Sequence, residues 1–398
     1  MPLRVSKRAE DMPASPIRRL VPFAEEAVAR GTKIYHLNIG QPDVESPAEF
    51  WAGIASVKQK VLEYGHSAGL RALRERAALA YREIGLEVTT DQLMVTTAGS
   101  EAVAFALQVV CDAGDEVIIP EPMYANYLGF AEAAGVRVVP VTTTLADDFR
   151  LPGASAFEAK ITPKTRAIMI CNPGNPTGVV YTRDQLEGLR DLAVRHGLFL
   201  IADEVYREFS YLGGRPVSVL ELEGLDEHAI MIDSVSKRFS LCGARIGFFV
   251  SRNAEVNAAA LKFAQARLSP PTLESLGVLA AMETPTEYFA AVRAEYQTRR
   301  DLVVRRLRAI PGVRCPQIDG AFYATVELPV DDADHFCRWL LESFSHEGET
   351  VMLAPASGFY ATEGLGKSEV RIAYVLNLDS LDRAMDLLER ALTAYQAS

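Results

Sequence analysis

The sequence predicts an α/β fold whose large domain is built on a seven-stranded, mostly parallel sheet flanked by helices. Seven apolar runs of strand length recur between residues 93 and 251, and helical patterns lie between them. The runs are apolar throughout rather than alternating, which is typical of strands covered on both faces. The runs are Leu93–Thr97, Glu116–Pro120, Val136–Val141, Ala167–Cys171, Leu198–Asp203, Ala229–Asp233 and Gly247–Ser251.

The helix signals begin with Thr182 and Gln185, which form a capping box in front of a helix that ends at Gly197. After about residue 270 the pattern changes, and this part of the chain predicts a smaller α+β domain. We expect a large domain over 46–295 and a small domain from 1–45 together with 296–398. The elements expected in the later part are one long helix over 275–310, a strand in 320–328, a helix in 333–348, a strand in 369–375 and a C-terminal helix from about Ser380.

Composition argues against several classes of partner. The chain has 398 residues and a formal net charge of −11, with no cluster of basic residues. Binding to nucleic acid or to an anionic membrane needs such clusters, so we expect neither. The five cysteines are scattered and never spaced as C-x-x-C, which disfavours a zinc site or a disulfide framework and suits a reducing cytoplasm. The N-terminus has no apolar signal region and no apolar run reaches membrane-spanning length, so we expect a cytoplasmic protein.

Polar and small residues follow several of the predicted strands. Open parallel sheets bind ligands at the carboxyl ends of their strands, so these residues are candidates for one site. Gly99, Ser100 and Glu101 follow the first run, where backbone N–H groups at a helix start can bind an anion; a helix merely capped by Ser100 is the alternative. Asn175 lies in the Pro-rich loop "NPGNPTG" after the fourth run, where a plain turn is the alternative.

Two further strand ends carry ionisable groups. Asp203 ends the fifth run and Tyr206 follows it; a carboxylate there is costly unless it is paired, although an aspartate that caps a helix is the alternative. Lys237 follows the sixth run in "SVSKRFSLCGARIG". Burial and neighbouring cations disfavour a charged lysine, and a neutral lysine is a nucleophile that forms Schiff bases with carbonyls.

Together these residues match the needs of pyridoxal 5′-phosphate. Its ring nitrogen needs an acid, which Asp203 offers, and its phenolic oxygen needs donors, which Tyr206 and Asn175 offer. Its aldehyde needs a lysine, which is Lys237. Its phosphate needs N–H groups, hydroxyls and a cation. The residues that fit the phosphate are Gly99, Ser100, Glu101, Ser234, Ser236 and Arg245.

The motifs "SVSKRFSLCGARIG", "NPGNPTG" and "ADEVY" resemble, in order and spacing, those of the class I aminotransferases, which are fold-type I pyridoxal-phosphate enzymes. The resemblance extends from "HLNIGQPD" to "VRIAY" and is nearest to the bacterial aspartate aminotransferase subgroup. It implies a ping-pong transfer of an amino group from an L-amino acid, with aspartate favoured, to 2-oxoglutarate. It also implies a homodimer with shared active sites, and it implies no metal.

The resemblance also implies individual roles. Lys237 would hold the cofactor covalently and move the substrate proton, with Asp203 at the ring nitrogen and Tyr206 as the third catalytic residue. Tyr124 would stack on the ring, and Tyr64 would reach the phosphate of the neighbouring subunit. The residues implied to bind substrate are Gly40, Asn175 and Arg371, the last through the α-carboxylate.

The chain departs from the family at the positions whose side chains bind the distal end of the substrate. Ala264 stands where some members have an arginine from the neighbouring subunit, and Arg267 is three positions away. Ser100 stands where another branch has a lysine. The candidates to replace these cations are Arg18, Arg19 and Lys33 in the N-terminal segment. "PASGF" (355–359) also replaces the usual "PG" before the late Phe.

Alternatives therefore stay open. The enzyme could be an aromatic or broad-range aminotransferase, or a pyridoxal-phosphate-dependent β-lyase, synthase or oxidase on the same fold, since fold and cofactor do not fix the reaction. Arg238, next to the predicted catalytic lysine, has no role in either interpretation.

Overall fold

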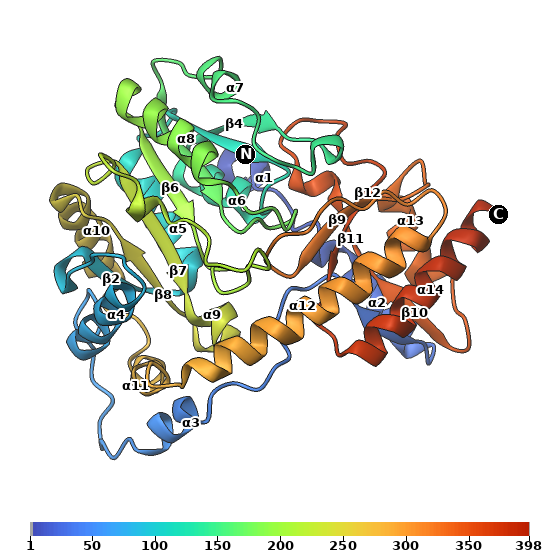
Figure 1. The fold of residues 1–398 in the computed structure, drawn as a ribbon, viewed down its shortest axis with the longest axis horizontal. Coiled ribbons are helices and arrows are strands. Elements are labelled where there is room, and N and C mark those ends of the chain that lie inside the picture. Colours follow the sequence, from blue (N-terminus) through green and yellow to red (C-terminus); the bar gives the residue numbers. More distant parts are fainter. Residues whose placement is uncertain (1–2, 398) are drawn as a thin grey trace.

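The computed structural model describes residues 3–397 and confirms the predicted α/β fold. Seven strands form one sheet in the order β2-β8-β7-β6-β5-β3-β4 (Figure 1). β8 runs antiparallel to both of its neighbours, and the other pairs are parallel. The strands are β2 (Leu93–Thr97), β3 (Glu116–Glu121), β4 (Arg137–Thr142), β5 (Thr165–Cys171), β6 (Phe199–Asp203), β7 (Ala229–Ser234) and β8 (Ile246–Val250).

Most helices lie where the hydrophobic pattern expects them, but the helix predicted over 333–348 ends at Glu342. A capping box formed by Thr182 and Gln185 starts α8, and Gly197 ends it in the left-handed conformation, as the sequence predicted. The helices are α1 (Lys7–Asp11), α2 (Val21–Ala29), α3 (Ala48–Ala55), α4 (Arg71–Glu83), α5 (Ala98–Val110), α6 (Asn126–Ala134), α7 (Ala154–Glu158), α8 (Arg183–His196), α9 (Val235–Arg238), α10 (Ala254–Arg267), α11 (Thr272–Ala281), α12 (Thr286–Ala309), α13 (Ala333–Glu342) and α14 (Leu378–Gln396).

Both faces of the central strands are buried, which explains why these strands are mostly apolar. In β7, Ile230 and Ile232 belong to one hydrophobic cluster and Met231 to the other. The first cluster includes residues of α5, α6 and α10, and the second includes residues of α4, α8 and α11. Side chains therefore alternate between two helix layers rather than between core and solvent.

The predicted long helix over 275–310 is wrong at one point, because the segment forms two helices. α11 ends at Ala281, and α12 begins at Thr286 after Pro285. Proline has no N–H to donate and disfavours helical backbone in the residue before it, so it breaks the helix here. The turn-forming residues were visible in the sequence, but the apolar periodicity on either side concealed the break.

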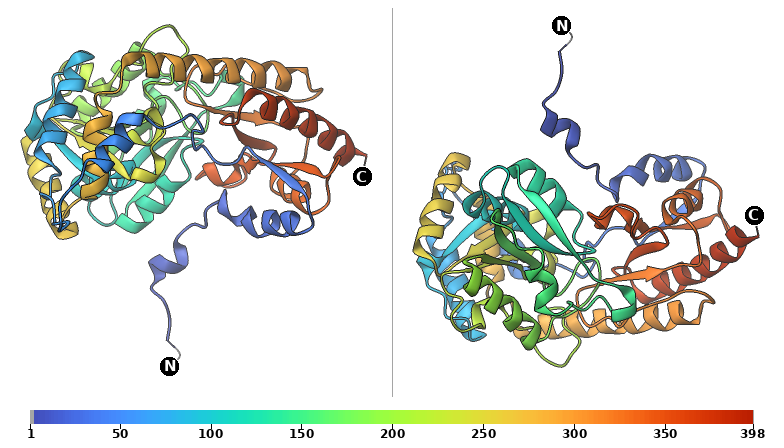
Figure 2. Two further views of the ribbon diagram at one scale, coloured as in Figure 1. Left: turned by 90° about the horizontal axis from the view of Figure 1, so that it is seen from below. Right: turned by 90° about the horizontal axis from the view of Figure 1, so that it is seen from above.

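The C-terminal part of the chain, together with one N-terminal strand, forms two small sheets. β11 (Ala354–Pro355), β12 (Glu369–Ala373) and β9 (Tyr323–Glu327) are antiparallel in the order β11-β12-β9, and β1 (Lys33–His36) pairs with β10 (Glu349–Met352). Figure 2 shows α12 running along one side of the molecule, from the large sheet to the helices around these small sheets. The division into 46–295 and 1–45 with 296–398 stays a prediction. Its boundary at residue 295 falls within α12.

Within residues 3–397, no helix is long and apolar enough to cross a membrane. All five cysteines are free thiols in the structure. The same residues contain no cluster of three or more His, Cys, Asp or Glu side chains that could hold a metal ion.

Candidate active site

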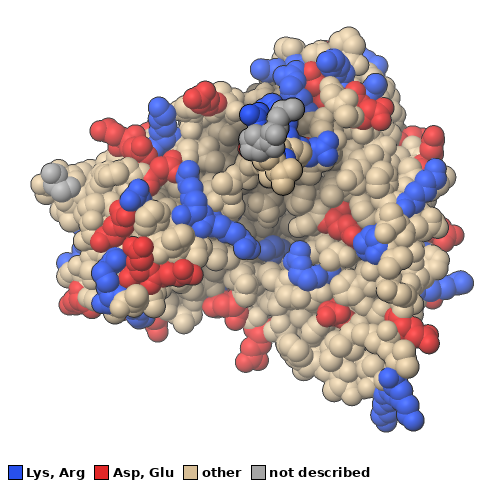
Figure 3. Space-filling view, turned by 180° about the vertical axis from the view of Figure 1, so that it is seen from behind, with Lys and Arg blue, Asp and Glu red and all other residues tan. Residues whose placement is uncertain are grey.

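A cavity of about 1120 Å³ lies at the carboxyl ends of the central strands. The strand ends, the start of α5, the N-terminal segment and β12 all contribute to it. Figure 3 shows a face of the molecule that is hollowed near its middle, with Lys and Arg side chains along the border of the hollow. The predicted site residues that line the cavity are Gly40, Gly99, Ser100, Tyr124, Asn175, Asp203, Tyr206, Ser234, Ser236, Lys237, Arg245 and Arg371.

Asp203 is a buried acid at the end of β6. Its carboxylate accepts hydrogen bonds from the Tyr127 hydroxyl at 2.6 Å and from the Val205 N–H at 3.3 Å. Burial raises the pKa of Asp203 from 3.8 to about 6, although these two donors oppose the shift. No helix follows Asp203 directly, so the helix-cap alternative is wrong. The carboxylate is therefore available to a cationic partner in the cavity.

Tyr206 and Asn175, which follow two different strands, come into contact in the cavity that Asp203 also lines. The Asn175 amide donates to the Tyr206 hydroxyl at 3.4 Å, and the hydroxyls of Tyr206 and Tyr323 lie 2.9 Å apart. Burial raises the pKa of Tyr206 well above its usual value of 10, so the phenol stays protonated and able to donate. The pair can donate two hydrogen bonds to one oxygen of a ligand.

Lys237 lies on α9, directly after β7. Ser234 caps this short helix by accepting from the Ser236 N–H at 3.1 Å. The Lys237 amine donates to the Gly40 carbonyl at 2.9 Å and lies 3.9 Å from the Cys242 sulfur. A lysine held by one carbonyl, with no carboxylate within ion-pair distance among the described residues, is positioned to react with a carbonyl compound.

An anion-binding corner forms where the end of β2 lies beside the start of β8. Ala98 and Arg245 both adopt left-handed backbone, with φ of 60° and 56°, and the Ala98 N–H donates to the Arg245 carbonyl at 3.0 Å. Such strain in residues other than glycine costs free energy and collects at functional sites. It turns the start of α5, with Gly99 and Ser100, toward Ser234. α5 begins at Ala98, so the alternative in which Ser100 merely caps the helix is wrong.

Gly247 makes this corner possible by allowing β8 to approach α5. A Cβ at this position would lie 2.4 Å from the Ala98 carbonyl carbon and 2.6 Å from the Gly99 nitrogen. We therefore expect Gly247→Ala to displace the start of α5, to destabilise the protein by about 1–3 kcal/mol and to weaken cofactor binding. Chemical denaturation and cofactor titration measure the two effects.

Gly243 provides the matched control for this substitution. It lies on the same segment, but a Cβ there would meet no atom within 4 Å. Gly243→Ala should leave both measurements unchanged. Equal behaviour of the two variants would contradict the importance of the close approach.

Arg371 is a buried cation in the cavity that has no carboxylate partner among residues 3–397. Its guanidinium donates to the Asn175 carbonyl oxygen at 3.1 Å and to the Asn38 carbonyl at 2.5 Å, and its Nε is buried without a partner. No carboxylate in residues 3–397 forms an ion pair with it, and burial lowers its pKa. A buried cation without a counter-ion is costly, so an anionic ligand would stabilise this arrangement.

Gly40 lies against the same group of residues. A Cβ on Gly40 would fall 1.8 Å from the Tyr323 hydroxyl, so no side chain fits there. The Tyr323 ring also lies under the Arg371 guanidinium, 4.6 Å from the ring centroid. The close approach places the backbone of Gly40 beside the substrate side of the cavity, although its N–H contact to a carboxylate stays a prediction.

Two predicted residues do not line the cavity. The Glu101 carboxylate accepts from the Thr97 N–H at 2.7 Å and pairs with Arg267 at 3.1 Å, behind the start of α5. Tyr64 lies between α3 and α4 and is 82% exposed. Its predicted contact is with a neighbouring subunit, so the structure of one chain leaves this role a prediction.

Arg238 and Arg267, which the sequence left without roles, both stabilise the scaffold. Arg238 and Arg207 flank the buried Asp233 at 3.6 and 3.0 Å, and the Tyr81 hydroxyl donates to the same carboxylate at 2.8 Å. Burial alone would raise the pKa of Asp233, but the two arginines outweigh it and hold the pKa below 3.8. This network joins the turn after β6 to the turn that carries Lys237.

Two tyrosines of the cavity were not anticipated from the sequence. Tyr127 hydrogen-bonds Asp203, and Tyr323 contacts both Tyr206 and Arg371. Tyr127 comes three residues after Tyr124, one turn along the start of α6, and this spacing could have indicated that both face the cavity. Tyr323 has no such signal, since an aromatic residue in a strand more often belongs to the core.

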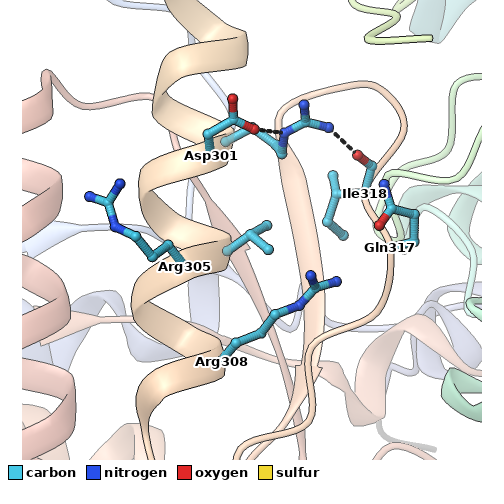
Figure 4. Close-up of a pocket in the computed structure, with 7 residues that line it drawn as sticks. Asp301, Arg305, Arg308, Gln317 and Ile318 are labelled. Atoms are coloured by element: carbon cyan, nitrogen blue, oxygen red, sulfur yellow. Dashed lines mark hydrogen bonds and ion pairs between the residues drawn. The ribbon is translucent and has the colours of Figure 1, made fainter.

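A second, smaller cavity of about 270 Å³ lies beside α12. Its lining includes Arg300, Arg305 and Arg308 of α12 together with Gln317 and Ile318. Figure 4 shows the Arg308 side chain extending from the helix toward the segment that carries Gln317 and Ile318. Arg300 is already held by Asp301 at 2.6 Å and by the Ile318 carbonyl at 2.5 Å. None of the predicted site residues lines this cavity.

The residues of the large cavity fit pyridoxal phosphate group by group. A buried acid, a pair of phenol and amide donors, a lysine, and a corner of N–H groups, hydroxyls and Arg245 all face one space. Next to them, the unpaired Arg371 offers a place for a carboxylate. This combination can bind a phosphorylated aldehyde and an amino acid side by side.

Comparisons with known proteins agree with this arrangement. The chain matches the family described as "Aminotransferase class I and II" over residues 32–388. The aspartate aminotransferase of Bacillus subtilis is 30% identical, with 98% of each chain covered. A solved structure of aspartate aminotransferase from Thermus thermophilus with maleate superposes with a TM-score of 0.88 at 30% identity, covering 98% of this chain and 100% of that one. Alanine aminotransferase from Pyrococcus furiosus superposes with a TM-score of 0.90 at 28% identity and the same coverage.

The predicted family, fold type and cofactor are therefore confirmed. The match spans most of the chain and includes every strand of the large sheet. The chain belongs to the class I and II aminotransferases and is a pyridoxal-phosphate-dependent enzyme similar to the aspartate aminotransferases.

Proposed function

We propose that this aminotransferase moves the amino group of an L-amino acid to 2-oxoglutarate by a ping-pong mechanism, with aspartate as the favoured donor. The observation that carries the proposal is Arg371, a buried guanidinium without a carboxylate partner in the same cavity as Lys237. A planar guanidinium binds a carboxylate through two hydrogen bonds, which fixes the orientation of an amino acid. The relatives named as aspartate aminotransferases support aspartate as the donor.

The proposed cofactor contacts follow the geometry of the cavity. Asp203 holds the ring nitrogen, Tyr206 and Asn175 donate to the phenolic oxygen, and Tyr124 covers the ring. The residues proposed to bind the phosphate are Gly99, Ser100, Glu101, Ser234, Ser236 and Arg245, with Tyr64 from the second subunit. Glu101 contributes through its backbone only, because its carboxylate is engaged by Arg267.

Lys237 and Arg371 have different roles toward the substrate: Lys237 transfers a proton, and Arg371 binds the α-carboxylate. When bound, pyridoxal phosphate supplies a protonated ring that withdraws electrons from the substrate Cα. Arg371 and the Gly40 N–H bind the α-carboxylate, and the Lys237 amine takes the proton from Cα. The Tyr206 hydroxyl would donate to the phenolic oxygen of the bound cofactor, and the Asp203 carboxylate would hold the proton on its ring nitrogen.

The proposal includes a homodimer with shared active sites in the cytoplasm. Tyr64 lies near other exposed apolar side chains, among them Val61 and Leu62, which are 68% and 60% exposed. Exposed apolar residues grouped on one segment are typical of a protein–protein interface. Five free cysteines suit a reducing compartment.

An aromatic or broad-range donor is the second candidate. Apolar side chains from the N-terminal segment and α6 line one part of the cavity, namely Ile17, Val21, Ile39 and Phe130. Such a surface can bury an apolar side chain, which would reduce the preference for aspartate.

A donor panel tests the proposed function. We expect the purified, cofactor-loaded protein to be yellow and to lose its visible absorption band on addition of an amino donor, with one equivalent of 2-oxo acid formed. Addition of 2-oxoglutarate should restore the band. Aspartate should exceed tyrosine and phenylalanine by more than about tenfold in kcat/KM, equivalent to about 1.4 kcal/mol. A smaller ratio would favour the broad-range enzyme, and a protein that stays colourless with added cofactor would contradict the proposal.

A further inference from the structure

Arg18, one of the three N-terminal candidates for the distal position, is the cation of the cavity to which the proposed function gives no contact. The cationic side chains lining the cavity are Arg18, Lys237, Arg245 and Arg371. The proposed function assigns Lys237 to the cofactor aldehyde, Arg245 to the phosphate and Arg371 to the α-carboxylate. The side chain of Arg18 is exposed and forms no hydrogen bond or ion pair with any residue in the described range 3–397.

The backbone on both sides of Arg18 is anchored to one short loop, the "PASGF" segment (355–359). Before Arg18, the buried Pro16 packs on Gly358 so closely that a Cβ on Gly358 would lie 2.3 Å from it. After Arg18, Arg19 forms an ion pair with Asp334, and Asp334 also accepts from the Ser357 hydroxyl at 2.5 Å. The segment is therefore held at residues 16 and 19, which leaves Arg18 directed into the cavity.

The same loop positions the α-carboxylate site. Phe359 lies under the Arg371 guanidinium, with 5.0 Å from the guanidinium carbon to the ring centroid. Ile17 packs on the small hydrophobic cluster that contains Phe359. One rigid loop thus supports both Arg18 and Arg371, so it sets the separation between the two guanidinium groups. This loop, "PASGF", differs from the usual family pattern. Its Gly358 leaves the space that Pro16 occupies, so the departure fixes the position of the segment that carries Arg18.

The other candidates for the distal position either form ion pairs already or carry no charge. Arg19 pairs with Asp334, and Lys33 binds Glu349 at 3.0 Å and the Tyr35 hydroxyl at 2.6 Å. Arg267 pairs with Glu101. The remaining two positions, Ala264 and Ser100, carry no charge.

We infer that Arg18 binds the distal carboxylate of a dicarboxylic substrate, aspartate, glutamate or 2-oxoglutarate, while Arg371 binds the α-carboxylate. This inference rests on the proposed aminotransfer reaction and names its substrate class. The apolar side chains beside Arg18, Ile17 and Val21 among them, exclude water from part of the surface and strengthen the ion pair. Because Arg18 is exposed and unpaired, it can turn toward solvent when the substrate carries an apolar side chain.

Comparing the binding of succinate and butyrate tests the contact between Arg18 and a distal carboxylate. Both acids have the same carbon chain, and only succinate has a second carboxylate. We expect Arg18→Gln in the cofactor-loaded enzyme to weaken succinate binding by about tenfold or more and butyrate binding by less than about twofold, measured by isothermal titration calorimetry. Arg18→Lys keeps the positive charge but cannot donate two parallel hydrogen bonds to a carboxylate. Its affinity for succinate should therefore lie between those of wild type and Arg18→Gln.

Arg8→Gln is the matched control, since Arg8 is an exposed arginine on α1 of the same segment and does not line the cavity. Figure 2 shows α1 projecting from the rest of the molecule. This control should leave the binding of both ligands unchanged. The inference is overturned if Arg18→Gln weakens the two ligands equally or affects neither. Binding requires no turnover, so this outcome is separate from a failure of the proposed reaction, which would appear as the absence of 2-oxo acid with every donor.

Discussion

Replacing Lys237 with alanine is expected to reduce the amino-donor half-reaction by about 10⁴-fold or more, because the substitution removes both the covalent attachment and the proton acceptor. The fold should survive, since the Lys237 amine makes only two hydrogen bonds with described residues, one to the Gly40 carbonyl and a weak one to the Cys242 sulfur. Cofactor should still bind without a covalent bond through Asp203 and the anion-binding corner. The measurements are stopped-flow absorbance after mixing with aspartate, and mass spectrometry of the reduced protein.

The control for this substitution is Lys160→Ala, an exposed lysine after α7. Wild type and control should retain the cofactor mass on the peptide that contains Lys237 after reduction, and Lys237→Ala should not. A variant that keeps more than about one per cent of the half-reaction rate would show that another group moves the proton. Cys242, 3.9 Å from the amine, would then be the next residue to test.

Much of the fold could be predicted because it depends on local patterns. The seven strands were found within one or two residues of their observed ends, since strands buried on both faces are apolar throughout. The break at Pro285 was missed because the apolar pattern continued on both sides of a short turn. The sheet order and the antiparallel position of β8 are set by packing over long sequence distances, and no local pattern encodes them.

In the candidate site, too, residues near strand ends could be predicted from the sequence, and residues positioned by long-range contacts could not. Asp203 ends a strand, and Asn175 and Lys237 come within four residues of one, so the strand ends predict that the three residues meet. Arg238 could not be placed, because its partner Asp233 is shared with Tyr81 and Arg207 from other parts of the chain. Arg18 could not be distinguished from Arg19 in the sequence, since their difference comes from the contact of Pro16 with Gly358 and from the ion pair of Arg19 with Asp334.

Asp203→Asn is expected to make the cofactor-free protein more stable at neutral pH. Burial raises the folded-state pKa of Asp203 to about 6 from 3.8. The folded state therefore binds the proton more tightly than the unfolded state, and the free energy of unfolding falls as the pH rises between these two values. The cost at neutral pH is at most about 3 kcal/mol. Asparagine does not ionise, so the variant should lack this part of the pH dependence.

The same substitution should lower activity by about 10²–10³-fold, because asparagine cannot neutralise a protonated ring nitrogen. Denaturation of the cofactor-free proteins at about pH 4 and about pH 8 measures the stability effect, and steady-state kinetics measure the activity. Burial also raises the pKa of Glu204, to about 7, but it does so equally in both proteins, so the difference between them reports Asp203 alone. Asp112→Asn, an exposed carboxylate, should change neither quantity. A variant less stable than wild type at about pH 8 would show that the Tyr127 and Val205 hydrogen bonds outweigh burial. The expected result instead means that Asp203 is maintained at a cost in stability, which the cationic ring of the cofactor offsets when it binds.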